Sequence, residues 1–325
     1  MVTLNTPYAT SPLIGGYTLQ VNEFGSTAAL TLTTDGNPDF AIANSAVAVA
    51  SNGMPAAYSS IYFGSHWGTK SATNALPVAV SSIKGGGVAL TSWSIDRSAV
   101  ASGSVYDCAY DIWFDPSATG NQGNGTSTEM MVWLAYAGCQ PAGSKVATAQ
   151  IINGISFDIW YSANGKGILS YVMTAASSAV NNLDIGLLAQ DAINRGWLTA
   201  AHYLTDVEAG FELWTNGTGL KTNSFSVSIG SLPVAISASA SVDKPTPAHG
   251  DTVTLTYAVS GNTGSGAQQI TVTGNVNVGG VNYPVTVPLT LPATAGLPVT
   301  YSTPTAPGLT FQTTGNPAVF TALIP

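Results

Sequence analysis

Residues 128–134 read TEMMVWL, and their side chains alternate between two kinds. Successive residues of a β-strand point to opposite faces of a sheet. One face of the predicted strand therefore carries Glu129, Met131 and Trp133, whereas the opposite face is entirely apolar. The segment predicts a strand that packs one face in a hydrophobic core and turns a carboxylate and a tryptophan away from it.

Three further segments repeat this pattern: YDCAYDIWFD at 106–115, SFDIWY at 156–161 and EAGFELW at 208–214. In each segment a carboxylate and the tryptophan two residues later share one face. These pairs are Asp111 and Trp113, Asp158 and Trp160, and Glu212 and Trp214. The opposite faces are apolar and can pack on a second sheet. The carboxylate faces cannot form a core, because unpaired buried carboxylates are too costly.

Short alternating segments separated by Gly, Asn, Pro and Ser recur along the first 230 residues. This arrangement is typical of an all-β antiparallel sandwich or jelly roll. One segment differs: NNLDIGLLAQDAINRGW at 181–197 has apolar residues at helical spacing, polar residues at its start and a glycine past its end. We therefore predict a single helix over 183–195, docked on the outside of the sheets.

The character of the sequence changes near residue 231, and all seven tryptophans precede this point. The segment ASVDKPTPAHGDTVTLTYAVSG at 240–261 resembles the immunoglobulin-like repeats of prokaryotic surface proteins. Residues 231–325 are therefore predicted to form a small C-terminal immunoglobulin-like β-sandwich. We favour a spacer or cell-surface role over a carbohydrate-binding module, because such modules usually bind polysaccharide on exposed aromatic platforms and this part has no tryptophan.

Charged residues make up 7% of the chain, against about 25% in a typical soluble domain. The eight basic residues are scattered and the net charge is -8, which excludes a nucleic-acid partner. No apolar run is long enough to span a membrane, and the N-terminus lacks the pattern of a signal peptide. A surface with few carboxylates changes its charge little in acid, so adaptation to low pH is a further hypothesis.

Two cysteines, Cys108 and Cys139, are too few for a disulfide framework and lack metal-ligand spacing. Cys108 is expected in a core, with a bridge to Cys139 as the alternative. The three histidines are far apart in sequence and form no zinc motif. Phosphate-binding and dinucleotide-binding glycine motifs are also missing from the sequence. We therefore expect neither a metal nor a cofactor.

A surface lined by tryptophan and carboxylates suits a saccharide, because sugar C–H faces stack on indole rings and sugar hydroxyls bond to carboxylates. Two carboxyl groups across such a cleft also suffice to hydrolyse a glycosidic bond. The residues alone leave the choice of this pair open. The candidates are Asp107, Asp111, Glu129, Asp158, Glu208 and Glu212.

Five motifs resemble those of family 12 glycoside hydrolases. They are AYDIWFDP (109–116), TEMMVW (128–133), QPAGSKVATA (140–149), NRGW (194–197) and VEAGFELWTNGTGLKTNSFSVSI (207–229). GGYTLQVNEFG (15–25) and YFGSHWG (62–68) are similar to the same family. The resemblance implies a two-sheet β-jelly roll whose concave sheet forms an open cleft. It also implies a retaining endo-β-1,4-glucanase that acts on cellulose or mixed-linkage β-glucan, with xyloglucan as the alternative substrate.

The same resemblance assigns roles to three carboxyl groups. Glu129 corresponds to the nucleophile, Glu212 to the general acid/base, and Asp111 to the aspartate that bonds to the nucleophile. Glu208 is expected to be structural or to contact sugar, and Asp107 to be a solvated charge at the cleft rim. The residues predicted to bind substrate are Asn22, Phe24, His66, Trp67, Trp113, Met131, Trp133, Pro141, Trp160 and Trp214.

Departures from the family pattern concern specificity. Phe24 stands where family members usually carry tryptophan, and Leu213 follows the acid/base where proline is common.

A non-catalytic glucan-binding lectin with a jelly-roll fold would not need Glu129, Glu212 and Asp111 together on one face. A purely structural surface-layer protein would not gather its tryptophans in one domain. We therefore expect an extracellular or cell-surface, monomeric enzyme whose partner is a β-1,4-linked glucan.

Overall fold

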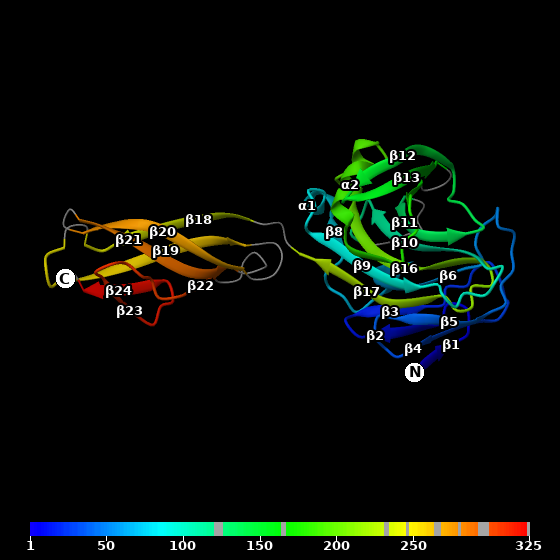
Figure 1. Ribbon diagram of the computed structural model, residues 1–325, viewed down its shortest axis with the longest axis horizontal. Helices are drawn as coiled ribbons and strands as arrows, with labels where there is room; N and C mark the ends of the chain where they lie inside the picture. Colours follow the sequence, from blue (N-terminus) through cyan, green and yellow to red (C-terminus); the bar gives the residue numbers. More distant parts are fainter. Residues whose placement is uncertain are drawn as a thin grey trace. The chain divides into compact units, whose positions relative to one another are not determined.

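The computed structural model describes residues 1–119, 126–163, 167–230, 234–244, 247–262, 268–278, 281–291 and 299–323. The chain divides into two compact units, Met1–Ile229 and Gly230–Pro325. Apart from two helices, the regular elements in these ranges are β-strands (Figure 1). The prediction of an all-β protein is therefore confirmed. No helix in the described ranges is long and apolar enough to cross a membrane.

The first unit contains two sheets (Figure 1). The smaller sheet has the order β1 (Val2–Leu4), β4 (Leu30–Thr34), β5 (Phe40–Ser45), β17 (Lys221–Ile229), β9 (Ala89–Asp96) and β15 (Ala179–Asp184). The larger sheet has the order β12 (Ser144–Ile152), β13 (Ile155–Ser162), β14 (Ile168–Met173), β11 (Thr128–Ala137), β10 (Val105–Asp115), β16 (Tyr203–Thr215), β6 (Ala57–His66), β3 (Tyr17–Gln20) and β2 (Thr10–Leu13). Two short strands, β7 (Thr69–Lys70) and β8 (Val78–Ala79), pair with β6 and β16. Neighbouring strands are antiparallel except β11 and β14, which pair in parallel.

The predicted alternation of faces is confirmed in the larger sheet. The apolar faces of β10, β11, β13 and β16 enter one hydrophobic core that they share with the smaller sheet. Trp93 of β9 joins the two sheets, because its ring meets Tyr110 at 5.2 Å and Phe211 at 5.9 Å between ring centroids. Its indole N–H donates to Thr222 Oγ1 at 3.1 Å, so the buried indole nitrogen has a hydrogen-bond partner.

Two central strands, β6 and β16, approach closely at Gly210. A Cβ at this position would lie 2.2 Å from the carbonyl oxygen of Ser59, so only glycine fits without a shift of the backbone. Gly210 lies midway between Glu208 and Glu212 on the same face of β16. The close approach therefore fixes the part of the sheet that carries both glutamates.

Helix α2 (Ile185–Asn194) corresponds to the helix predicted over 183–195. It begins after Asp184, whose side chain accepts hydrogen bonds from the N–H groups of Gly186 and Leu187. Its apolar face, which includes Leu188, belongs to the core between the sheets. A second helix, α1 (Val80–Ile83), was not predicted, because four residues are too short to show helical periodicity.

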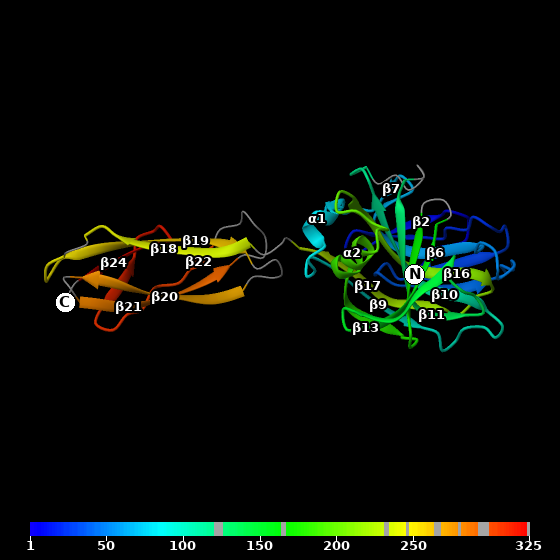
Figure 2. The same cartoon turned by 90° about the horizontal axis from the view of Figure 1, so that it is seen from above.

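The second unit contains two sheets within its described residues. One has the order β18 (Val234–Val242), β19 (Thr252–Asn262), β24 (Val319–Leu323) and β23 (Thr310–Thr313), and the other β20 (Gln268–Val278), β21 (Val281–Leu291) and β22 (Thr300–Tyr301). In Figure 2, β18 and β19 lie on one side of this unit, and β20 and β21 lie on the other. Leu255 and Phe320 from one sheet and Val285 and Val287 from the other form a common core. The immunoglobulin-like assignment of this unit stays a prediction.

Candidate active site

A cleft of about 1460 Å³ is lined by the outer face of the larger sheet in the first unit, opposite the core, together with nearby loops. Most of the residues predicted to form the site line it. These are Asn22, Phe24, His66, Trp67, Asp111, Trp113, Glu129, Met131, Trp133, Pro141, Glu212 and Trp214. Residues 138–143, which include Pro141, line it as well.

Strand register brings the carboxyl groups together. Strand β10 lies between β11 and β16, and its Asp111 is opposite Met131 on one side and Glu208 on the other. Trp113 is likewise opposite Glu129 on β11. Because residues two apart share a face, the floor of the cleft combines carboxyl groups from all three strands.

The floor is far less exposed than the sequence predicts. Asp111 is 6% exposed and Trp133 is 1% exposed. Met131, Trp133, Ala109 and Val172 pack into a small hydrophobic cluster of their own. The prediction that this face cannot form a core is therefore wrong. At Asp111 the burial raises the pKa of the carboxyl and so favours its neutral, protonated form.

Glu212 is partly exposed to this cleft and has an environment suited to keeping a proton. Burial raises the pKa of its carboxyl well above the usual value. The negative charge of Asp107, a hydrogen bond to Asp107 and the charge of Glu129 raise it further. A glutamic acid that holds its proton near neutral pH is what a general acid requires.

Asp107 corrects one prediction directly. It was expected to be a solvated charge at the rim, but it is fully buried. The register that pairs Tyr106 with Leu213 and Ala109 with Gly210 places Asp107 opposite Glu212. Its Oδ1 accepts a hydrogen bond from the backbone N–H of Glu212 at 3.4 Å. Burial raises the pKa of the Asp107 carboxyl as well, whereas its hydrogen bond with Glu212 lowers it.

Asp111 lies beside Glu129. Burial raises the pKa of the Asp111 carboxyl, and the charge of Glu129 raises it further. Asp111 Oδ1 is buried without a hydrogen-bond partner among the described atoms. Glu129 is partly exposed to the cleft, and its backbone N–H donates to the carbonyl oxygen of Gly167 at 3.4 Å. This arrangement supports a role for Asp111 next to Glu129, while the assignment of that role stays a prediction.

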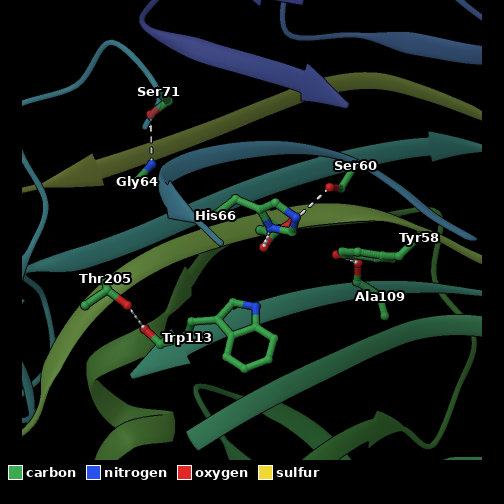
Figure 3. A network of polar contacts seen from close by, with 9 residues as sticks. Tyr58, Ser60, Gly64, His66, Ser71, Ala109, Trp113 and Thr205 are labelled. Carbon is green, nitrogen blue, oxygen red and sulfur yellow. Dashed lines mark hydrogen bonds and ion pairs between the residues drawn. The ribbon is translucent and has the colours of Figure 1, made fainter. Parts of the chain in front are cut away.

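A second polar group lies on the β6 side of the cleft (Figure 3). His66 Nδ1 lies 2.6 Å from Glu208 Oε1, and Ser60 Oγ donates to Glu208 Oε2 at 2.9 Å. Asp206, two residues before Glu208 on the same face, was missed by the sequence analysis. The alternation in TDVEAGFELW was the signal that could have found it. His66, Asp206 and Glu208 place potential metal-ligand atoms within 4.8 Å of one another, although the sequence spacing predicts no metal site.

Aromatic and apolar side chains extend the cleft. Trp67 is 55% exposed and meets Trp113 edge to face at 6.2 Å between ring centroids. Trp214 Nε1 donates to the carbonyl oxygen of Gly53 at 2.8 Å, which fixes its indole. Tyr8 and Met54 also line the cleft and are exposed, but neither lies in a strand with a recognisable alternating pattern. Exposed rings of this kind suit the faces of sugar rings.

Three further predictions concern residues outside this group. Trp160 is not among the residues that line the cleft; it packs against the small cluster of the floor, and Lys145 Nζ lies 5.6 Å from the centre of its ring. Asp158 forms an ion pair with Lys145, which removes it from the catalytic candidates. Cys108 is buried and unpaired with Cys139, so the alternative of a disulfide is wrong.

A cleft of aromatic rings with a protonated glutamic acid beside other carboxyl groups can bind a sugar chain and cleave it by acid-assisted displacement. The jelly roll and this site together define a glycoside hydrolase. More specifically, the chain belongs to glycosyl hydrolase family 12, whose sequence profile matches residues 15–230.

The chain is similar to several members of this family. It is 35% identical over 141 residues to the "Probable cellulase Cel12b" of Mycobacterium tuberculosis, which covers 42% of this chain and 88% of that protein. It is 30% identical over 166 residues to "Endoglucanase S" of Pectobacterium parmentieri, covering 49% of this chain and 60% of that one. Among solved structures, the "Endoglucanase cel12A from Rhodothermus marinus" has a TM-score of 0.66 at 31% identity, covering 71% of this chain and all of that one.

Xyloglucan-specific relatives are also found. The "Probable xyloglucan-specific endo-beta-1,4-glucanase A" of Aspergillus clavatus is 31% identical over 137 residues, which cover 41% of this chain and 54% of that protein. The family is therefore shared by enzymes named for different glucans, and membership by itself leaves the preferred glucan open.

Proposed function

We propose that the chain is a retaining endo-β-1,4-glucanase that hydrolyses cellulose or mixed-linkage β-glucan by double displacement. The observation that carries this proposal is the pairing of a proton-holding Glu212 with Glu129 in one cleft, on strands that flank β10. Glu129 attacks the anomeric carbon and forms a covalent glycosyl-enzyme, while Glu212 protonates the leaving oxygen. Water then attacks the anomeric carbon while Glu212 takes its proton, and the bond to Glu129 breaks, which restores both carboxyl groups.

Asp111 is proposed to orient Glu129. It is buried on the strand between the two glutamates, where the charge of Glu129 acts on it. The aromatic side chains of the cleft, Trp67, Phe24 and Trp214 among them, are proposed to stack on glucose rings. Both proposals concern how the substrate and the nucleophile are held rather than the bond-making steps.

The decisive experiment measures reducing-sugar release from carboxymethylcellulose, barley β-glucan and xyloglucan, with the anomer of the first product recorded by NMR. We expect β-anomeric product, and loss of turnover with retained oligosaccharide binding in Glu129→Gln. Inverted product or full activity of this variant would refute the assigned mechanism. If the chain binds these polymers but hydrolyses none of the three, the alternative of a non-catalytic glucan-binding lectin would be favoured.

Xyloglucan is the second candidate substrate. Relatives named as xyloglucan-specific support it, and so does Phe24, whose ring is smaller than the tryptophan expected at this position. A higher kcat/KM on xyloglucan than on barley β-glucan would select this alternative.

We also propose that the protein is a monomer that works outside the cell or at its surface, with Gly230–Pro325 as an immunoglobulin-like spacer. The two-sheet core of this second unit supports the spacer. Light scattering would test the monomer, and cell fractionation would test the location. Retention on insoluble cellulose of the full chain, but not of a chain that ends at residue 230, would instead make the second unit a carbohydrate-binding module.

A further inference from the structure

The cluster of His66, Asp206 and Glu208 is not used by the proposed reaction. Glu208 is fully buried, and both of its oxygens are engaged, one by His66 and the other by Ser60; Figure 3 labels these two partners on β6. Asp206 is also fully buried, and outside the cluster and the adjacent Val207 neither oxygen of its carboxyl has a hydrogen-bond partner among the described atoms. Two carboxyl groups that face one another in a buried space cost stability unless their charge is neutralised. Asp206 offers a carboxylate oxygen within 4.8 Å of ligand atoms of His66 and Glu208.

The backbone makes room for this carboxyl. Asp206 is opposite Gly64 on β6, and a Cβ at Gly64 would lie 2.8 Å from Asp206 Oδ1. Gly64 has a φ of 138°, which glycine tolerates and other residues rarely adopt. None of the ion pairs between described residues gives Asp206 a lysine or arginine. Two carboxyl groups and one imidazole therefore share a buried space, and none of the described lysines or arginines forms an ion pair with either acid.

We propose that His66, Asp206 and Glu208 form a binding site for a divalent transition-metal ion of the zinc or manganese class. One imidazole nitrogen with two carboxylate oxygens suits these ions better than Ca²⁺ or Mg²⁺, which prefer oxygen ligands alone. A 2+ ion also balances two carboxylates beside a neutral histidine. The charge of the cluster is then zero without a proton on either acid.

The geometry of the cluster is compatible with this assignment. With metal–ligand bonds of about 2.0–2.2 Å, the separation of 2.6 Å between His66 Nδ1 and Glu208 Oε1 corresponds to an angle of about 75–80° at the metal. That angle is close to the right angle of octahedral coordination. Ligands on opposite sides of such an ion are about 4.2 Å apart, so Asp206 needs to move by about half an ångström at most. His66 and Glu208 are among the residues that line the cleft, and all three side chains of the cluster are buried.

The test uses the full chain without an affinity tag and measures Zn²⁺ binding by calorimetry near pH 7.5. We expect about one ion per chain, and affinity weakened by at least about tenfold in Asp206→Asn and in His66→Gln. The matched controls are His202→Gln, which removes a histidine outside the cluster, and Asp158→Asn, which removes a carboxylate outside it. Both controls are expected to bind Zn²⁺ as the unaltered chain does.

Absence of stoichiometric binding at about 100 µM free Zn²⁺ would overturn the proposal, and so would unchanged binding in both cluster variants. Either result would leave a hydrogen-bonded cluster of one histidine and two acids. If a cluster variant fails to fold, Co²⁺ bound to the unaltered chain decides the question. A paramagnetically shifted NMR signal from the His66 imidazole supports the site, and an unshifted His66 signal with Co²⁺ in excess refutes it.

Discussion

Replacement of Glu212 by alanine should slow hydrolysis of a glucan much more than hydrolysis of an activated aryl glycoside. Burial and the neighbouring acid Asp107 both raise the pKa of the Glu212 carboxyl. It therefore holds its proton over the pH range in which a glucose leaving group needs one. A 2,4-dinitrophenolate leaving group departs without protonation, so the same variant should cleave 2,4-dinitrophenyl cellobioside with a nearly normal first step.

The magnitude follows from the environment of the carboxyl. A positioned general acid contributes about 10²–10⁴-fold, which is about 2.7–5.4 kcal/mol at about 1.36 kcal/mol per tenfold change. Because burial keeps Glu212 protonated and limits competition from water, we expect the upper half of that range, about 10³–10⁴-fold in kcat/KM on barley β-glucan. On the aryl cellobioside we expect a loss of less than about tenfold, since kcat/KM reports the first step.

The assay compares kcat/KM for both substrates in Glu212→Ala and in Glu208→Gln, which alters a cleft carboxyl two residues earlier on the same strand. The Glu208 variant should affect both substrates to a similar degree, because Glu208 is bonded to His66 and Ser60 and has no assigned proton transfer. Added azide should restore turnover of the aryl substrate by Glu212→Ala, because it attacks the glycosyl-enzyme without a general base. Equal losses on both substrates in Glu212→Ala would refute the general-acid assignment.

Three further predictions follow from the buried acids and the core. Asp107→Asn removes a charge and a hydrogen bond that raise the pKa of Glu212, so this pKa should fall. Carboxyl ¹³C NMR can follow the Glu212 signal because the chain has only four glutamates. An unchanged pKa of Glu212 would exclude the pairing of Asp107 with Glu212. The folded-state pKa values of Asp107, Asp111 and Glu212 are raised, so these three groups bind more protons in the folded state than in the unfolded chain. Asp35, Asp96 and Asp158 have lowered pKa values and act in the opposite direction, but water screens their contributions because they are far less buried. The free energy of unfolding should therefore be greatest below the unfolded-state pKa values of about 4, and it should fall as the pH rises through the raised folded-state pKa values. Urea unfolding between pH 4 and 8 measures this free energy. A free energy of unfolding that increases across that range would contradict the prediction. Trp93→Ala should cost about 3–5 kcal/mol, because it empties the junction between the sheets; a urea midpoint unchanged at constant m-value would contradict that estimate.

The acid-stability prediction also bears on the composition. With charged residues at 7% of the chain, few surface carboxylates lose their charge in acid, and burial raises the pKa of Asp107, Asp111 and Glu212, which favours their neutral form. The low surface charge and the raised pKa values of the buried acids therefore both favour stability at acidic pH. A stability maximum near neutral pH would remove both arguments for adaptation to acid.

Sequence by itself determined which face of each strand enters the core. The alternation in residues 105–115, 128–137 and 203–215 depends only on the local two-residue period, so Glu129, Trp133 and Glu212 could be placed on one face without knowledge of their neighbours. Family resemblance then distinguished the nucleophile from the other carboxylates. The signal that predicts helix α2 is also local, because its periodicity and its cap at Asp184 lie within one segment.

Only the tertiary structure decided which of these residues are neighbours. Asp107 meets Glu212 because a register between strands about a hundred residues apart aligns them, and no local pattern encodes that register. Asp206 meets His66 through the pairing of β16 with β6 in the same way. Trp160 shares the pattern of the other tryptophans, but its strand β13 is separated from the central strand β10 by β14 and β11, and it does not line the cleft. Faces follow from the geometry of one strand, whereas proximity follows from how distant strands pair.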